Sequence, residues 1–211
     1  VRRSAMISLS NLSDDRMRHA KSGQWWETAA HRALANNSVS YTERPDIETF
    51  MREWTALVES KSGERGIFNR EAAKKKVAEN GRRDPEHEFG TNPCSEIILR
   101  PYQFCNLTEV VIRATDETKD LKRKVRLASQ LGTYQSTLTD IKYLRKIWRD
   151  NTEEERLLGV SLTGIMDNQL TIEADPKLLK SMREMAVETN KELAKKLKIP
   201  QSTATTCIKP S

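Results

Sequence analysis

The chain has 211 residues, and its 36 lysines and arginines exceed its 30 aspartates and glutamates by enough to give a formal net charge of +6. Charged residues make up 31% of the chain, and no apolar run approaches the ~20 residues that span a bilayer, which excludes a protein with membrane-spanning helices. The two signs of charge are interspersed, whereas nucleic-acid-binding proteins usually cluster their basic residues on one face. A basic nucleic-acid-binding module is therefore the least favoured class, and no direct nucleic-acid contact is expected.

The three cysteines, Cys94, Cys105 and Cys207, bear on the cellular compartment of the protein and on whether it binds zinc or forms structural disulfides. No C-x-x-C pattern occurs, and the three histidines lie far from the cysteines in sequence, so a structural zinc site is unsupported and no metal site is predicted. Small disulfide-stapled domains are denser in cysteine. We therefore expect a cytoplasmic protein with reduced thiols.

In the first half of the chain, the pattern predicts strands and helices in alternation. A short apolar strand at 1–8 is followed by a helix that opens at Ser13-Asp14-Asp15. A second helix is predicted over 25–35, a strand over 36–41, a helix after Asp46, a turn at 63–66 and a helix over 69–79. The helix after Asp46 carries a continuous apolar stripe at helical spacing, formed by Ile47, Phe50, Met51, Trp54, Leu57 and Val58.

The second half continues the alternation. The residues from 82 to 91 are polar and predict a loop, and the apolar run 96–99 predicts a buried strand. Further strands are predicted over 105–112, 157–162 and 203–208. Helices are predicted from 121 to about Gly132, over 141–148, and from Pro176 to Pro200. This alternation indicates an α/β protein.

The stretch Asn92-Pro93-Cys94-Ser95-Glu96 combines an amide, a thiol and a carboxylate at positions i, i+2 and i+4. In an extended segment these three side chains point to the same side, and Pro93 forbids a helix interior. A nearby carboxylate raises the pKa of a thiol, which disfavours a thiolate nucleophile and favours hydrogen-atom chemistry. On spacing alone, an ordinary turn with a buried cysteine remains the better interpretation, since most single cysteines are small buried hydrophobes.

Seven runs together carry a resemblance that spans essentially the whole chain. "NPCSEI" followed by "FCNLTEV" resembles the active-site loop of ribonucleotide reductases. The runs "VRRSA", "ALANNSV", "GERGIFNREAA", "LLGVSLTG" and "TTCIKPS" are similar to that family in the family's order. One short match would be weak evidence for the family. This many matches, in the same order along the chain as in the family, are specific evidence.

The resemblance implies a role for each residue of the loop. Cys94 would become the thiyl radical that removes the 3′ hydrogen of the ribose, and Glu96 would accept the proton of the 3′-hydroxyl. Asn92 would hydrogen-bond the ribose hydroxyls. Cys105 would be one of two cysteines that reduce the 2′ carbon and form a disulfide.

The separation of eleven residues between Cys94 and Cys105 is similar to the adenosylcobalamin-dependent, triphosphate-reducing branch of the family. The presence of Glu96 argues against the glycyl-radical branch. The resemblance therefore implies adenosylcobalamin as cofactor, although it identifies no residue that contacts it. The implied partners are a ribonucleoside triphosphate substrate, a deoxynucleotide effector and a thioredoxin-like reductant.

Both ends of the chain resemble binding segments of the family. Arg2, Arg3 and Ser4 lie in a run similar to the loop that links the specificity effector to the substrate base. Without the family match, two arginines near a terminus would be read as solvated. Pro210 and Ser211 begin a run that resembles the substrate-phosphate site at a helix N-terminus.

The fold implied by the resemblance is part of a ten-stranded α/β barrel, made of two five-stranded half-barrels with a central finger loop. We expect residues 1–211 to form a single partial catalytic barrel domain, with the finger loop at about 90–100. The cysteine that pairs with Cys105 is expected upstream of this chain, and Cys207 is interpreted as a buried strand cysteine. The chain is thus expected to be an internal fragment that is inactive alone. A non-catalytic remnant, or half of a split subunit that completes the barrel with another chain, remains the alternative.

Overall fold

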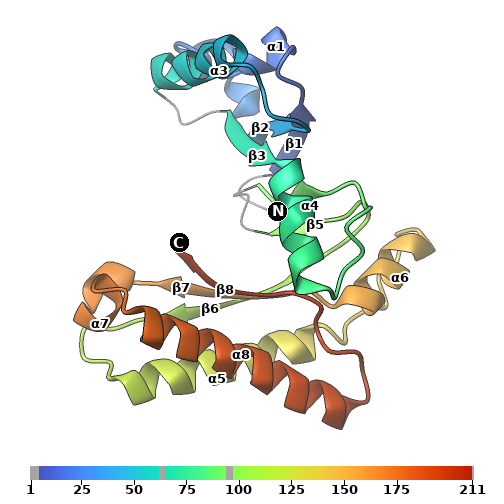
Figure 1. Cartoon of the computed structure of the whole chain (residues 1–211), viewed down its shortest axis with the longest axis vertical. Helices are drawn as coiled ribbons and strands as arrows, with labels where there is room; N and C mark the ends of the chain where they lie inside the picture. Colours follow the sequence, from blue (N-terminus) through green and yellow to red (C-terminus); the bar gives the residue numbers. More distant parts are fainter. Residues whose placement is uncertain (1–4, 62–64, 94–96, 211) are drawn as a thin grey trace. The chain divides into compact units, whose positions relative to one another are not determined.

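The computed structural model describes residues 5–61, 65–93 and 97–210 of the chain. The chain folds as two compact units, Val1–Pro101 and Tyr102–Ser211, and each contains its own parallel sheet (Figure 1). Among the described residues, no helix is both long and apolar enough to cross a bilayer.

The sheet of the first unit has three parallel strands in the order β1-β2-β3. β1 (Ala5–Ser10) pairs with β2 (Ala35–Tyr41), which pairs with β3 (Gly66–Asn69). Parallel strands need crossover connections, and the crossovers here hold α1 (Asp15–Arg18) and α3 (Ile47–Ser60). The first two strands were predicted, whereas β3 lies where only a turn was expected.

Side-chain caps fix where the longer helices of this unit begin. Asp46 accepts a hydrogen bond from the Thr49 N–H at 2.8 Å and starts α3. Asn69 accepts one from the Ala72 N–H at 2.8 Å and starts α4 (Arg70–Asn80). Gly81 ends α4 with φ 62°, in the left-handed region that glycine adopts without strain. Both helices were predicted from these residues.

The helix predicted over 25–35 is wrong in its extent. Only α2 (Trp25–Thr28) is α-helical, and η1 (Ala30–Arg32) is a single 3-10 turn. Ala29 between them has φ −142° and ψ 40°, which is not helical, and β2 already begins at Ala35. Neither short helix buries a side chain, and helices of this length depend on packing to persist.

The helix α3 buries a polar face and leaves most of its apolar stripe exposed. Its buried residues are Glu53, Ala56 and Ser60, whereas Ile47 and Val58 of the stripe are 75% and 63% exposed. An amphipathic helix ordinarily packs its apolar stripe against the core. A buried ion network, described below, holds α3 by its polar face instead.

The other sheet of the first unit is a two-stranded antiparallel hairpin. β4 (Gly90–Thr91) pairs with β5 (Ile98–Leu99), so the strand predicted over 96–99 is shorter than expected. The hairpin packs beside α4 through a small apolar cluster, which also contains parts of β1 and β3. The buried members of this cluster are Phe68, Ala73, Val77 and Phe89, with Leu9 and Ile98 partly buried against them.

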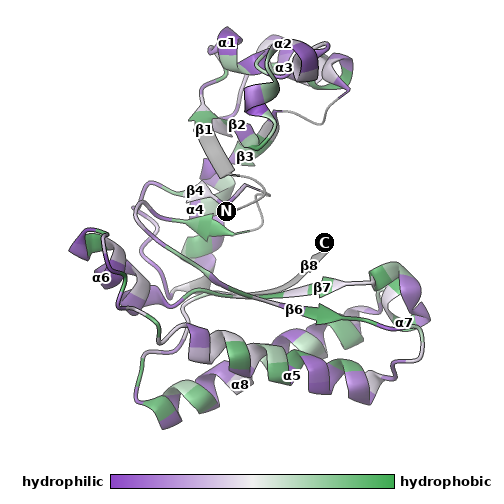
Figure 2. Cartoon of the chain, turned by 180° about the vertical axis from the view of Figure 1, so that it is seen from behind, coloured by the Kyte–Doolittle hydropathy of each residue, from purple (hydrophilic) through white to green (hydrophobic). Residues whose placement is uncertain are grey.

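The second unit is a three-stranded parallel sheet, β6-β7-β8, covered by two long helices. The strands are β6 (Asn106–Val111), β7 (Leu158–Thr163) and β8 (Thr205–Pro210), all close to their predicted positions. The helices α5 (Thr118–Gln135) and α8 (Pro176–Leu197) lie side by side against one face of the sheet (Figure 1). Apolar and hydrophilic residues alternate along both helices (Figure 2).

The core of this unit lies between the sheet and the two helices. β7 is buried almost throughout, as expected for a central parallel strand. α5 contributes Leu121 and Val125, and α8 contributes Leu178, Met182 and Ala186. The apolar spacing of the helix predicted from Pro176 to Pro200 predicts that Leu178 and Met182 face inward, and both are buried.

Two helix boundaries in the second unit differ from the prediction. α5 runs through Gly132 to Gln135, and Gly132 lies where the helix approaches Leu158 too closely for a side chain. The helix predicted over 141–148 is displaced, since α6 spans Lys146–Glu155. The smaller η2 (Ile165–Asp167) and α7 (Gln169–Ile172) follow β7. The α/β class is confirmed, whereas the described residues form two open three-stranded sheets rather than a closed barrel.

Candidate functional site

The predicted active-site run lies at the tip of the β4–β5 hairpin. Asn92 directly follows β4, and Ile97 directly precedes β5. Cys94 and Glu96, with Ser95 between them, lie outside the described residues. The structure therefore gives the frame of the loop, and the roles of Cys94 and Glu96 stay predictions.

Asn92 closes the base of this loop with its backbone and its side chain. Its N–H donates to the Ile97 carbonyl at 3.4 Å, and the Ile97 N–H donates to Asn92 Oδ1 at 3.0 Å. The carboxamide oxygen is thus committed to holding the loop. No acceptor for Nδ2 is found among the described residues. The half-buried Asn92 holds the loop through its carboxamide oxygen and its backbone N–H.

Two arginines that flank α4 hold the two sides of the hairpin. Arg70 Nε donates to the Phe89 carbonyl at 2.8 Å, just before β4. Arg83 Nη1 donates to the Ile98 carbonyl of β5 at 3.0 Å, and its guanidinium lies 5.0 Å from the centre of the Phe89 ring. Phe89 is fully buried. These residues were not predicted, because a buried arginine cannot be told from a solvated one in a charged stretch.

Cys105 lies in the second unit, immediately before β6, and its side chain is half-buried. The next residue, Asn106, is buried and donates to the Leu157 carbonyl both from its backbone N–H at 2.9 Å and from Nδ2 at 3.0 Å. These two bonds fix the start of the strand and with it the backbone at Cys105. Its role as a reducing cysteine stays a prediction.

The remaining predicted site residues lie at the two ends of the chain. Arg2, Arg3 and Ser4 of the predicted specificity loop, and Ser211 of the predicted phosphate run, lie outside the described residues. Pro210 ends β8 and stands opposite Leu162 of β7. Cys207 lies within β8, as its interpretation as a strand cysteine requires.

A buried ion network joins α1 and α3 to the β1–β2–β3 sheet. The fully buried carboxylate of Glu53 accepts from Arg65 Nε at 2.6 Å, from Arg65 Nη2 at 2.8 Å and from Arg18 Nε at 3.0 Å. Arg65 also donates to Ser10 Oγ at 2.6 Å. Burial alone raises the pKa of Glu53, but the hydrogen bonds from Arg65 and Arg18 more than offset it and hold the pKa below its usual range. Burial, together with the nearby Glu53 charge, raises the pKa of Tyr41.

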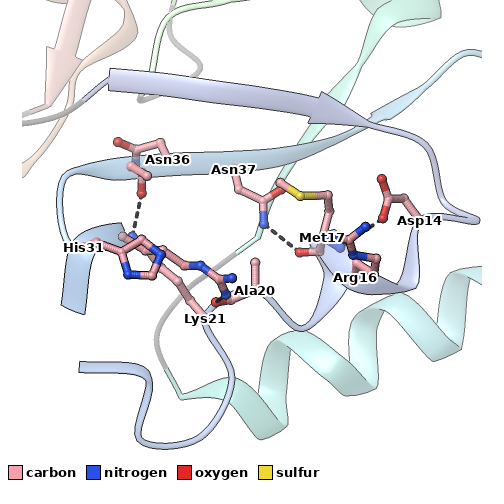
Figure 3. A pocket seen from close by; sticks show the side chains of 10 residues that line it. Asp14, Arg16, Met17, Ala20, Lys21, His31, Asn36 and Asn37 are labelled. Atoms are coloured by element: carbon pink, nitrogen blue, oxygen red, sulfur yellow. Dashed lines mark hydrogen bonds between the residues drawn. The ribbon is translucent and has the colours of Figure 1, made fainter. Parts of the chain in front are cut away.

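A pocket of about 480 Å³ opens between α1, η1 and the start of β2. Asn36 and Asn37 on β2 face Met17, Lys21 and His31 across it (Figure 3). Lys21 donates to the Ala35 carbonyl at 2.5 Å, and Asn37 Nδ2 donates to the Met17 carbonyl at 2.7 Å. These hydrogen bonds connect the segment that contains α1 to β2, so the polar residues that line the pocket have a structural role. Among the described residues, no cluster of His, Cys, Asp and Glu is suited to a metal ion.

Comparison with known proteins shows that the chain is similar in fold to a ribonucleotide reductase. The chain matches a crystal structure of a B-12-dependent (class II) ribonucleotide reductase with a TM-score of 0.67, over 94% of this chain and 31% of that one. The identity is 22%, so this match shows the fold alone. No family model matches the chain.

The curated relatives belong to one branch of the ribonucleotide reductases, the adenosylcobalamin-dependent ribonucleoside-triphosphate reductases. The adenosylcobalamin-dependent ribonucleoside-triphosphate reductase of Lacticaseibacillus paracasei is 36% identical over 172 residues, which are 79% of this chain and 22% of the relative. The enzyme of the same name from Lactobacillus leichmannii is 31% identical over 179 residues, 81% of this chain and 23% of the relative. The resemblance is confirmed: the chain is homologous to one segment of these reductases and spans less than a quarter of their length.

Proposed function

We propose that the chain is part of the catalytic barrel of a ribonucleotide reductase, which converts ribonucleotides to deoxyribonucleotides by thiyl-radical chemistry in the cytoplasm. The similarity to adenosylcobalamin-dependent ribonucleoside-triphosphate reductases over 79% of the chain carries this proposal. The substrate class is accordingly a ribonucleoside triphosphate.

The proposed chemistry assigns one task to each residue of the loop. A thiyl radical at Cys94 abstracts the 3′ hydrogen of the ribose, and Glu96 accepts the proton of the 3′-hydroxyl. Asn92 donates hydrogen bonds to the ribose hydroxyls, which is supported by Nδ2, whose N–H groups have no acceptor among the described residues. The 2′-hydroxyl takes a proton from the thiol pair formed by Cys105 and a second cysteine and leaves as water. The pair then gives its second proton and two electrons to the nucleotide and becomes a disulfide. Cys94 returns the hydrogen to the 3′ carbon and is a thiyl radical again, and Glu96 returns the proton to the 3′ oxygen.

The cofactor proposed from the relatives' names is adenosylcobalamin, which would supply the radical when bound. The fit of this chain to the cofactor rests on the relatives alone. The pockets along the described residues hold about 480 to 760 Å³, and charged side chains line each of them. Such surfaces identify no residue as a corrin contact, so every step above is assigned to this chain's own side chains.

We further propose that the two parallel sheets are arcs of the two half-barrels of a ten-stranded barrel, and that the β4–β5 hairpin is the base of its finger loop. Parallel sheets are normally covered on both faces or closed, and each arc here has only three strands. In this arrangement Arg2, Arg3 and Ser4 relay the deoxynucleotide effector to the substrate base. Pro210 and Ser211 begin the substrate-phosphate site. A thioredoxin-like protein would restore the cysteine pair.

The experiment that tests the proposal is a nucleotide-reduction assay with adenosylcobalamin and dithiothreitol. The 211-residue chain alone is expected to give no repeated turnover, because it holds only one member of the reducing cysteine pair. The Lactobacillus leichmannii enzyme serves as the positive control. Multiple turnovers by the isolated chain would contradict the assignment of Cys105 to a pair completed elsewhere.

Substitutions in a complete reductase that carries this segment distinguish the proposed roles of the three cysteines. Cys94→Ser is expected to abolish reduction, whereas Cys105→Ser should still permit cobalt–carbon bond cleavage, followed by stopped-flow absorbance. Cys207→Ser is the matched control, because it lies in β8 and has no proposed chemical role. Activity retained by Cys94→Ser would show that the radical site is wrong.

A second candidate function assumes the same family, but with the reductase barrel divided between two polypeptides. The chain covers 22% of its relative, which also suits one half of a split subunit. Such a half would co-purify with an upstream polypeptide that carries the second cysteine, and the mixture would reduce nucleotides where neither part does. Failure of the mixture to form a complex would exclude this candidate while leaving the first untouched.

A further inference from the structure

Cys105 lies between two residues that are both bonded to the segment joining α6 to β7. Two residues before it, the buried Gln103 donates from Nε2 to a carboxyl oxygen of Glu155, the last residue of α6. Directly after it, Asn106 donates twice to the Leu157 carbonyl, as described above. The chain is therefore held on both sides of the cysteine by partners that lie 52 and 51 residues further along the sequence.

Glu155 is itself held by two other segments of the second unit. It is only 3% exposed, and its carbonyl accepts from the Thr203 N–H at 2.9 Å and from Thr203 Oγ1 at 3.3 Å. The next residue, Arg156, has φ 44°, in the left-handed region, and its guanidinium donates to the Ser136 carbonyl. The carboxyl group of Glu155 is therefore a fixed acceptor for Gln103, because the backbone that carries it is bonded independently of that contact.

The residues on either side of Gln103 contact the same helix. The rings of Phe104 and Tyr102 lie 4.7 Å and 5.7 Å from the Trp148 ring of α6, measured between centres. Asn151 of α6 donates from Nδ2 to the Tyr102 carbonyl at 3.2 Å. Helix α6 thus contacts three successive residues directly before the cysteine. Of these contacts, the bond to Gln103 is the buried one, so water competes least for it.

We propose that Glu155 is a positioning residue for Cys105, and that it acts through its bond with Gln103 to hold the thiol in place for reduction of the nucleotide. This inference rests on the proposed function, in which Cys105 belongs to the reducing pair. Two cysteines form a disulfide only when their Cα atoms lie within about 7 Å and their Cβ atoms are directed toward each other. A displacement of about 1 Å can lower a rate on the order of 100-fold. A buried bond on the segment that leads to Cys105 therefore bears directly on the reducing step.

Alkylation of Cys105 in the 211-residue chain tests this bond without any reductase activity. The substitutions Cys94→Ser and Cys207→Ser leave Cys105 as the single thiol. Gln103→Ala is expected to raise the rate of iodoacetamide alkylation about fivefold or more, because the segment that carries the half-buried thiol opens more often. Thr139→Val is the matched control, since it removes a side-chain hydrogen bond of 2.6 Å to the same helix and should leave the rate unchanged. An unchanged rate in the Gln103→Ala chain overturns the proposal.

A single turnover by a pre-reduced, complete reductase that carries this segment separates positioning from folding. Gln103→Ala and Glu155→Ala should each slow deoxynucleotide formation at least about tenfold. Cobalt–carbon cleavage, followed by stopped-flow absorbance, should be unchanged in both variants. Glu155→Gln keeps an oxygen that can accept from Gln103 and should recover most of the rate. The double variant should be no slower than Glu155→Ala alone, because both substitutions remove the same hydrogen bond.

The outcomes distinguish a failure of this inference from a failure of the proposed function. An equal loss of cobalt–carbon cleavage and of reduction, or a double variant much slower than either single one, overturns the positioning role. Circular dichroism shows whether each variant is folded, and Gln103→Ala carries the test alone if Glu155→Ala does not fold. Full reduction by a Cys105→Ser reductase would instead contradict the proposed function, whatever the alkylation rates.

Discussion

Replacing Glu53 by glutamine tests whether the ion network holds the first unit together. In the structure this carboxylate is fully buried and accepts three hydrogen bonds, two from Arg65 and one from Arg18. Glutamine keeps the shape and one acceptor oxygen, but it removes the negative charge between two buried guanidinium groups. Breaking a buried ion pair from one side costs about 3–5 kcal/mol. We expect Glu53→Gln to lose about 3 kcal/mol and Glu53→Ala, which also leaves a cavity, about 5 kcal/mol.

The assay is urea unfolding of the 211-residue chain, followed by tryptophan fluorescence in a Trp148→Phe background. Trp148 is the only tryptophan of the second unit, so the remaining signal reports the first unit. Glu48→Gln is the matched control, because its ion pair with Arg52 is exposed and should contribute less than ~1 kcal/mol. A loss of under 1 kcal/mol for Glu53→Gln would refute the reasoning.

The pH dependence gives an independent test with a fixed sign. The pKa of Glu53 is lowered in the folded chain, so its stabilisation is complete above the unfolded value of about 4.3 and is lost as the pH falls toward the folded pKa. The difference in unfolding free energy between wild type and Glu53→Gln should therefore shrink below about pH 4. A constant difference from pH 7 to pH 3 would show that the charge of Glu53 does not carry the effect.

Two further predictions concern the second unit and the hairpin. Gly132→Ala gains about 1 kcal/mol of helix propensity but forces its Cβ against Leu158, and overpacking costs about 1–3 kcal/mol, so thermal unfolding should show a net loss of about 1 kcal/mol. Arg83→Met should speed hydrogen exchange of the Ile97 amide roughly tenfold without changing exchange in β7, because Arg83 holds the Ile98 carbonyl; equal protection in both variants would contradict its anchoring role.

Much of the fold follows from local signals in the sequence. Asp46 and Asn69 cap the helices that follow them, and Asp175 accepts from two backbone N–H groups to start α8. The continuous apolar run at Leu158–Thr163 is a buried parallel strand, as its composition indicates. In each case the deciding interaction lies within a few residues of the chain.

The errors arise where distant residues decide the outcome. From the sequence alone, Glu53 is one charge on a helix face that would be solvated. In the structure Arg18 and Arg65 bond to it, and these contacts bury the polar face of α3 instead of the apolar one. Gly132 lies inside α5 rather than at its end, at a position where Leu158, distant in sequence, occupies the space that a side chain would fill. The chemistry of the predicted loop depends equally on distant partners, so spacing alone favoured a turn.

In the first unit, hydrogen bonds to and across the β4–β5 hairpin position the proposed reactive loop. Among the described residues, the apolar cluster around Phe89 contains four buried side chains, and apolar packing is not directional. Hydrogen bonds from Arg70 and Arg83 to hairpin carbonyls fix both direction and distance, and Asn92 then closes the loop at its base. A thiol that must meet one hydrogen atom of a bound ribose has to be held within about 0.5 Å. The arginines that flank α4 are thus as much a requirement of the proposed chemistry as the residues that perform it.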